Sequence, residues 1–305
     1  MPSKRTFLHG LATVLTGSLV ATVPATAIDS SKQHTAPIDS AVSIQANQRV
    51  IQLIDQPEQI APYIHQLQDA VPSLSLADCT DIQSVGAVRS DFTTEGLLTV
   101  SGSFDAAVSD DVAGADAVQT KETQHETVYE IPSAQSAATI EPNAITAAHN
   151  QSTEEARAQL TENTEGTVAQ TQQYRSHLTG PAVRRLQPHL AGDLTMTASV
   201  GPVIRSAALE EAEALPGSLE TIVEITEAIG LSISPTPTET TFKYVIVAQP
   251  SELAAVSVED VVTSLSLSDD IEQTLSVTQS DAVATVSVTI PTTEVVQQHL
   301  GTIDF

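Results

Sequence analysis

The chain has 305 residues, of which 38 are acidic and 12 are lysine or arginine, so its formal net charge at neutral pH is −26. Its single cysteine excludes an internal disulfide framework and a zinc site built from four cysteines. A chain this acidic repels phosphate backbones and anionic lipid surfaces, so we expect no nucleic-acid partner.

Residues 1–27 have the features of an export signal. Lys4 and Arg5 supply positive charge, and residues 7–23 form an apolar stretch without an acidic group. Ala25-Thr26-Ala27 then places small residues before a cleavage site. The charged part resembles a twin-arginine signal with lysine at the first arginine position, and the general secretory route stays open. We predict cleavage after Ala27 and a location outside the cell or on its surface. An uncleaved segment would instead be a membrane anchor.

Without residues 1–27, the chain keeps 10 basic and 38 acidic residues, a net charge of −28. Small soluble domains usually carry a net charge of about 2–8 in magnitude. Self-repulsion at this charge destabilises a compact state in dilute buffer, whereas at 1 M salt the Debye length falls to about 3 Å. The composition, with 3% aromatic residues, resembles that of haloarchaeal proteins. We therefore expect a halophilic protein.

The stretch 28–80 is interpreted as a linker followed by a short helical lead-in. Residues 28–48 are polar and are assigned to the linker. Val50, Leu53 and Ile54 begin a helical pattern that Pro57 and Pro62 interrupt.

Alternating apolar residues predict a first β-rich unit over residues 81–150. Two strands are expected around 82–88 and 98–102, joined by a turn at 91–96. An acidic helix at 106–117, a strand at 127–131 and a strand pair at 137–140 and 144–148 follow.

Residues 151–191 are predicted to be helices that bridge two halves of the protein. Ser152 and Glu155 have capping-box spacing and open the first helix; further helices are expected at 168–178 and 183–190.

A second β-rich unit is predicted over residues 192–305. Its expected strands are 194–200, 231–234, 242–247, 274–278 and 283–290. An amphipathic helix over 219–229, stopped by Gly230, a helix over 258–267 and a last helical turn at 294–300 complete it. The order of strands and helices after residue 80 resembles that after residue 192. We predict an α+β fold of two similar units, each a mostly antiparallel sheet with helices on one face, in a ferredoxin-like arrangement.

Several phrases after residue 80 resemble a group of exported haloarchaeal proteins of unknown function. They are Thr99-Val100-Ser101-Gly102-Ser103-Phe104, Val128-Tyr129-Glu130-Ile131, Ala191-Gly192-Asp193-Leu194 and Phe242-Lys243-Tyr244-Val245-Ile246-Val247. The resemblance implies a surface location and transfers no site residue. Many of those proteins look like lipoproteins, and this chain lacks their lipid-acceptor cysteine.

The sequence carries no phosphate-binding, dinucleotide-binding or serine-hydrolase motif, and we predict no cofactor and no metal site. His125-Glu126-Thr127-Val128-Tyr129 has tyrosine where a zinc protease needs its second histidine. Cys79 lies between Asp78 and Asp81, and these carboxylates disfavour a reactive thiolate. The carboxylate clusters at 105–111, 210–213 and 269–270 are interpreted as solvated surface.

Basic residues gather in one stretch of this acidic chain: Arg175, His177, Arg184, Arg185 and His189. They could form a pocket for a small anionic ligand, because arginine offers a forked donor set to carboxylate or phosphate. They could equally neutralise acidic faces where the two halves meet, or lie favourably at the carboxyl ends of helices. Asn150-Gln151-Ser152 is a sequon for N-glycosylation.

These patterns favour a non-catalytic envelope or extracellular interaction protein with an unidentified protein or envelope partner. A binding module for a small anionic ligand is the alternative, and a carboxylate-based hydrolase is the weaker one.

The intact mass of the native protein tests the export prediction. We expect a mass that begins at Ile28 in the culture supernatant or on the cell surface. A full-length mass confined to membranes would instead establish residues 7–23 as an anchor, and a full-length cytosolic protein would contradict export.

Overall fold

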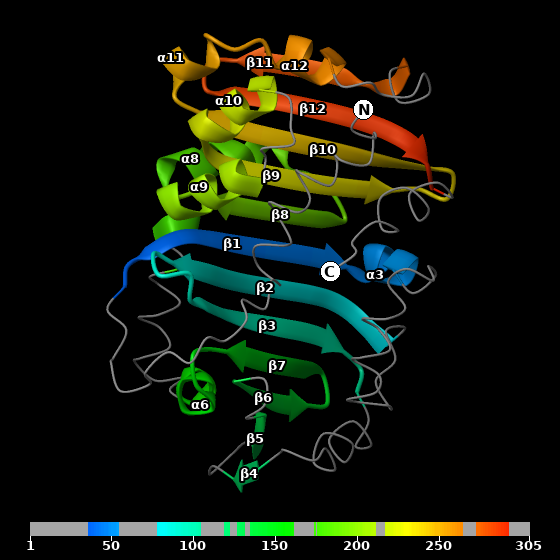
Figure 1. Ribbon diagram of the computed structural model, residues 1–305. Coiled ribbons are helices and arrows are strands. Elements are labelled where there is room, and N and C mark those ends of the chain that lie inside the picture. Colours follow the sequence, from blue (N-terminus) through cyan, green and yellow to red (C-terminus); the bar gives the residue numbers. More distant parts are fainter. Residues whose placement is uncertain are drawn as a thin grey trace.

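The chain folds around one large antiparallel sheet, shown in the computed structural model of Figure 1. The structure describes residues 36–54, 78–104, 119–122, 127–131, 135–161, 174, 176–211, 217–264 and 273–292. The strands are β1 (Ile38–Asn47), β2 (Cys79–Arg89), β3 (Thr94–Gly102), β4 (Gln119–Glu122), β5 (Thr127–Ile131), β6 (Ser136–Glu141), β7 (Ala144–His149), β8 (Leu194–Ser199), β9 (Thr226–Pro235), β10 (Glu239–Ala248), β11 (Ser276–Ser280) and β12 (Val283–Pro291). The helices are α3 (Gln48–Ile54), α6 (Thr153–Thr161), α8 (Pro181–Leu186), α9 (Pro202–Glu211), α10 (Gly217–Ile225), α11 (Pro250–Leu253) and α12 (Val258–Ser264), with a 3₁₀ turn η4 (Gln187–His189).

Strand β1 lies in the middle of the sheet and joins its two halves. The strand order is β11-β12-β10-β9-β8-β1-β2-β3-β7-β6-β5-β4, so β1 pairs with β2 on one side and β8 on the other. This confirms an α+β fold with an antiparallel sheet, but the two predicted units share one sheet. The linker interpretation of residues 28–48 is wrong over residues 38–47. Val42, Ile44 and Ala46 alternate there with polar residues, which is the period of a strand.

The strand order within each half does not show the expected ferredoxin-like arrangement, because most consecutive strands are neighbours. On one side of β1 the order is β2-β3, followed by β7-β6-β5-β4; on the other it is β8-β9-β10, followed by β12-β11. In each half the strands nearest β1 follow outward in chain order (β2, β3 and β8, β9, β10). The outer strands follow in reverse chain order (β7 to β4 and β12, β11). The sheet twists strongly, so that β5 and β4 are seen nearly edge-on (Figure 1).

Helices cover both faces of the sheet. The two helices predicted within the second unit, α10 and α12, share one face, and α8 on the opposite face belongs to the stretch predicted to bridge the halves. Successive residues of a strand point to opposite faces. On what we call the α10 face, Phe242, Tyr244 and Ile246 of β10 belong to a core that includes residues of α10 and α12. On the opposite, α8 face, Val245 and Val247 of the same strand pack with α8.

Two of the three helices expected to bridge the halves each pack on their own half. Ala156 and Leu160 of α6 lie against Ala137 and Ala148, on β6 and β7. α8 packs on β8, β9 and β10, at the other side of β1. The bridging role therefore belongs to β1, and the expected helix at 168–178 lies largely outside the described residues.

Most predicted hairpins are confirmed. β2 pairs with β3, β6 with β7 and β11 with β12, each close to its expected bounds. Asp281 adopts a positive φ of 47° in the turn between β11 and β12. The predicted helix cap is also present, since the Glu155 backbone N–H donates to Ser152 Oγ at 3.2 Å.

The region between β8 and β9 departs from prediction. Helix α9 was not anticipated, and α10 ends at Ile225 rather than at Ile229. Residues 226–235 instead pair with β8 and β10, so Gly230 lies inside a strand. A Cβ atom at Gly230 would come within 2.7 Å of Leu190, so the glycine leaves room for that side chain rather than ending a helix.

The first residues of β1 hold the start of α9. Asp39 accepts hydrogen bonds from the backbone N–H groups of Val203 (3.0 Å) and Ile204 (3.2 Å), and Ser40 Oγ accepts one from Gly201 N–H at 2.8 Å. These are N-terminal donors that a helix cannot satisfy by itself. A Cβ atom at Gly201 would lie 2.2 Å from the Asp39 carbonyl oxygen, so this close approach requires glycine.

The other end of β1 is tied to the start of β8. Asn47 Nδ2 donates to Asp193 Oδ1 at 2.6 Å, and the Asn47 backbone N–H donates to the Asp193 carbonyl at 2.8 Å. Arg49 forms an ion pair with the same carboxylate at 3.4 Å. Contacts at both ends therefore fix the register of the central strand.

We expect Asp39→Ala to destabilise the protein by about 1 kcal/mol, because α9 loses its capping carboxylate. Asp39→Asn keeps one acceptor oxygen and should lose less. Urea unfolding at fixed salt measures both. Equal stability of Asp39→Ala and the unsubstituted protein would show that the cap contributes nothing.

Candidate binding surface

The predicted basic cluster is not gathered in one cavity. Arg184 and Arg185 are exposed in the last turn of α8, and His189 is exposed in η4. His177 lies before α8 and lines a pocket that the other described members do not line. Arg175 lies outside the described residues. The structure therefore separates a histidine beside a pocket from an arginine pair on a helix surface.

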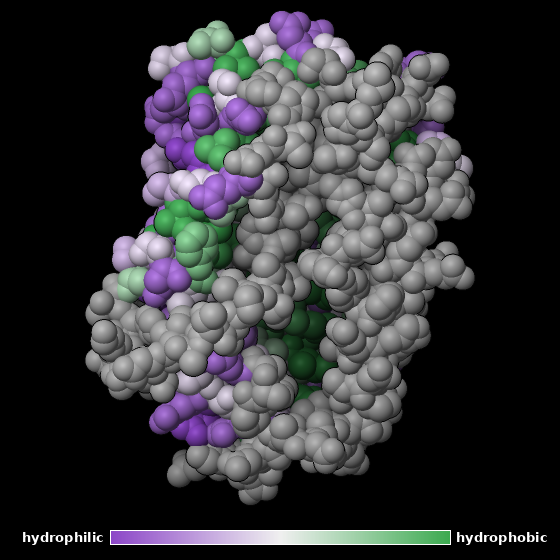
Figure 2. All heavy atoms as spheres, viewed as in Figure 1, coloured by the Kyte–Doolittle hydropathy of each residue, from purple (hydrophilic) through white to green (hydrophobic). Residues whose placement is uncertain are grey.

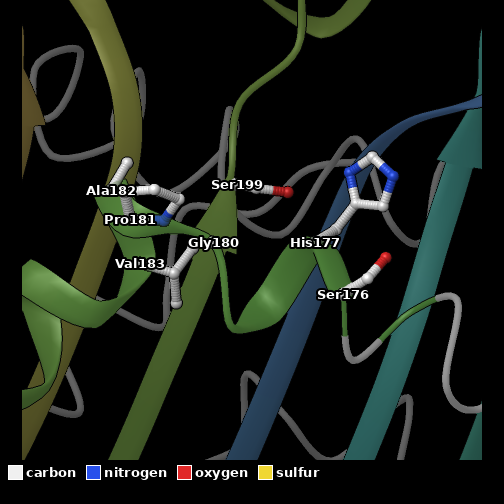
Figure 3. A pocket seen from close by; sticks show the side chains of 7 residues that line it. All are labelled: Ser176, His177, Gly180, Pro181, Ala182, Val183 and Ser199. Atoms are coloured by element: carbon white, nitrogen blue, oxygen red, sulfur yellow. The ribbon is translucent and has the colours of Figure 1, made fainter.

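The pocket is small and open, with a volume of about 260 Å³. It is lined by Ser176, His177, Gly180, Pro181, Ala182, Val183 and Ser199 (Figure 3). Ser199 Oγ is engaged with β1, since it accepts from Ala41 N–H at 3.0 Å and donates to the Ala41 carbonyl at 3.4 Å. Among the described lining residues, His177 offers the one ionisable side chain. This lining lacks the forked cationic donors that the sequence led us to expect.

The described arginines fall into two groups. Arg89 pairs with Glu95 at 2.8 Å and Arg157 with Glu130 at 2.7 Å. Arg49 pairs with Asp193, and Arg205 donates to the carbonyls of Val200 and Thr226.

Arg184 and Arg185 form the second group, because their side chains make no ion pair or hydrogen bond in the described part of the chain. Lys243, half-buried on β10, shares this property. In a chain with 38 carboxylates, three cationic side chains without a carboxylate partner are unexpected.

Lys243 lies on a sheet surface made almost wholly of hydroxyl side chains. We define this hydroxyl platform as the part of the α8 face of β10, β12 and β11 that lies between Glu239 and the valines packed on α8. Cross-strand pairing aligns Lys243 with Ser287 and Ser276. The platform residues are Thr241, Lys243, Ser276, Thr278, Ser280, Thr285, Ser287 and Thr289, exposed on β11 and half-buried on the inner strands.

The platform side chains include no carboxylate. Glu239, at the start of β10, and Asp281, in the turn after β11, lie at its ends. α8 packs on Val245 and Val247 of the same face, next to the platform along β10, and its two arginines are exposed. The threonine hydroxyls of 241 and 289 bond to each other at 2.9 Å.

A second surface feature is apolar. Figure 2 shows hydrophobic residues at the bottom of a hollow over the part of the sheet formed by β2 and β3. Leu98 of β3, with 39% of its surface exposed, lies in this part of the sheet. Ile82, Val100 and Ile145 are half-buried nearby, against the core that contains Cys79.

One buried ionisable group lies close to the Arg89–Glu95 pair. Tyr174 is fully buried against Ile38 and Ala87. Burial, and then the Glu95 carboxylate, raise the pKa of Tyr174 well above its usual range. Because the tyrosine stays neutral, it adds no further charge to the buried ion pair.

The remaining predicted residues do not form a catalytic centre in the described part of the chain. Tyr129 belongs to strand β5 and is buried, so the segment has no helical face for zinc; His125 and Glu126 lie outside the described residues. The described residues hold no group of three or more histidine, cysteine or acidic side chains that could bind a metal ion. The carboxylates at 105–111 and 269–270 lie outside the described residues.

The sequon asparagine is buried. Asn150 has 4% of its surface exposed, and its Oδ1 accepts a hydrogen bond from the Gln151 backbone N–H at 2.8 Å. A glycan needs an accessible side-chain amide, so this burial argues against glycosylation of the folded chain.

Comparison with models of known protein families finds no match. Comparison with curated proteins also finds none. Among solved structures, crystal form III of TP0453 is similar over 87% of this chain and 95% of that chain, with 13% identity and a TM-score of 0.47. Crystal form I is similar over 87% and 94%, with 11% identity and a TM-score of 0.48. No helix among the described residues is long and apolar enough to cross a membrane.

Cys79 should be slow to react in the folded protein. Burial, and secondarily Asp78, raise the pKa of its thiol from 9.0 to about 11. At pH 8, below both values, this lowers the thiolate fraction about 100-fold relative to an ordinary thiol. We therefore expect alkylation by iodoacetamide to be at least 100-fold slower in the folded than in the urea-unfolded chain. Similar rates in both states would contradict this burial.

Proposed function

We propose that the protein is a non-catalytic interaction protein of the cell envelope or exterior, and that the hydroxyl platform is its binding surface. The observation that supports this most is the platform itself. It is a sheet surface whose side chains include no carboxylate, in a chain of net charge −26. Lys243 on this surface, and Arg184 and Arg185 of the adjacent helix α8, have no carboxylate partner among the described residues.

The rest of the fold gives this surface a rigid support. On the reverse side of the same strands, Phe242, Tyr244 and Ile246 are buried in the core formed with α10 and α12. Their packing holds β10 and β12 in place, so side chains on the outer side keep fixed spacings. Cross-strand neighbours lie about 4.8 Å apart, and alternate residues along a strand about 6.8 Å.

We also retain the duplication of an α+β unit as a proposal, in a form without the ferredoxin-like order. Its support is that in both halves the strands nearest β1 follow outward in chain order and the outermost strands follow in reverse chain order. Export and the halophilic character are part of the same proposal. Export is needed because the platform can bind an envelope partner only outside the cell.

Two carboxylates placed on the platform should abolish its binding. We expect Ser276→Glu with Thr278→Glu, both on exposed positions of β11, to lower co-sedimentation with envelope fragments of the producing organism at least tenfold. The negative charges would oppose a partner attracted by Lys243 and the α8 arginines.

The matched control is Gln45→Glu with Gln48→Glu, which adds the same charge at exposed positions outside the platform. Its co-sedimentation should equal that of the unsubstituted protein. Binding that is equally lost in both variants, or that is absent in the unsubstituted protein, would overturn the proposal.

A further inference from the structure

We infer that the platform binds an acidic polysaccharide, with sugar hydroxyls on its serine and threonine rows and carboxylates on Lys243, Arg184 and Arg185. This inference rests on the proposed function and names the class of partner. It combines three observations: the hydroxyl rows, the cations of β10 and α8 that have no partner among the described residues, and the lack of a carboxylate on the platform.

The cations are available because the structure does not use them internally. Arg49, Arg89, Arg157 and Arg205 all bind carboxylates or carbonyls within the chain. Arg184 and Arg185 are exposed on α8 instead, and their guanidinium groups can each bind a carboxylate through two parallel hydrogen bonds. A favourable interaction with the carboxyl end of α8 explains the charge of these residues but not that of Lys243, which lies on a strand.

The hydroxyl rows match a polyol. Each serine or threonine hydroxyl is both a donor and an acceptor, as is each sugar hydroxyl. Pairing places Ser276, Ser287 and Lys243 in one line across three strands, and Thr278 and Thr285 in the next. A chain that lies across the strands would therefore meet a hydroxyl about every 4.8 Å, with a cation at the inner end of one row.

Other polymers fit this surface less well. The platform measures roughly 10 Å by 20 Å between its outer Cα positions, far less than the about 800 Å² that each partner buries in a standard protein interface. Its members include no aromatic or large apolar side chain to act as a protein anchor. Nucleic acid would need several phosphate contacts against a net charge of −26.

The test is retention of the folded protein on immobilised alginate, a polyuronate, at constant salt. We expect retention, displacement by free alginate, and at least tenfold weaker binding for Lys243→Gln and for Arg184→Gln with Arg185→Gln. Arg49→Gln removes one charge outside the platform and should bind as the unsubstituted protein does. Circular dichroism of each variant establishes that it is folded.

Three results would overturn the inference: no retention of the unsubstituted protein, equal retention of all variants, or displacement by polyglutamate as effective as by alginate. The last would show that carboxylates suffice without sugar hydroxyls. Envelope binding that Ser276→Glu with Thr278→Glu abolishes, together with no binding to alginate, would reject the polysaccharide and leave the proposed function standing.

Discussion

The structure depends on the insertion of β1 between the two halves of the sheet. Its two edges pair with β2 and β8, and no other described strand joins those neighbours. The strand is fixed at its start by the Asp39 and Ser40 contacts to α9, and at its end by Asn47 and Arg49 on Asp193. Residues more than 140 positions apart in the chain are thereby held in register. Such long-range pairing costs considerable loop-closure entropy, which the shared core on the α10 face must offset.

The distribution of charge follows from the scarcity of cations. Arginines 89 and 157 neutralise carboxylates that are largely buried, where an unpaired charge would be costly. Arg205 satisfies carbonyl groups at the end of α10. Lys243 on the sheet, and Arg184 and Arg185 on α8, have no such internal partner among the described residues. Their position beside a neutral hydroxyl surface is the basis for assigning a binding role to that face.

Local patterns predicted much of the secondary structure. The β2–β3, β6–β7 and β11–β12 hairpins have alternating residues and recognisable turns, and Ser152 marks the start of α6. Prediction failed where local and tertiary preferences differ. Residues 219–229 have a helical apolar pattern, but from Thr226 onward the backbone donors and acceptors pair with β8 and β10. Strand β1 was not predicted because its polar residues resemble a linker, although Val42, Ile44 and Ala46 show the period of two.

The candidate surface could be predicted only in part. The arginine pair is visible in the sequence as a local excess of positive charge. Lys243 lies 58 positions after Arg185, and only the packing of α8 on β10 brings their two elements together. The sequence by itself determined the net charge, most hairpins and the start of α6, because these depend on composition or on residues close together in the chain. Tertiary structure alone decided that the halves share one sheet, that helices cover both faces and which hydroxyls share a surface with the cations. Those features depend on pairing between distant strands, which local periodicity does not encode.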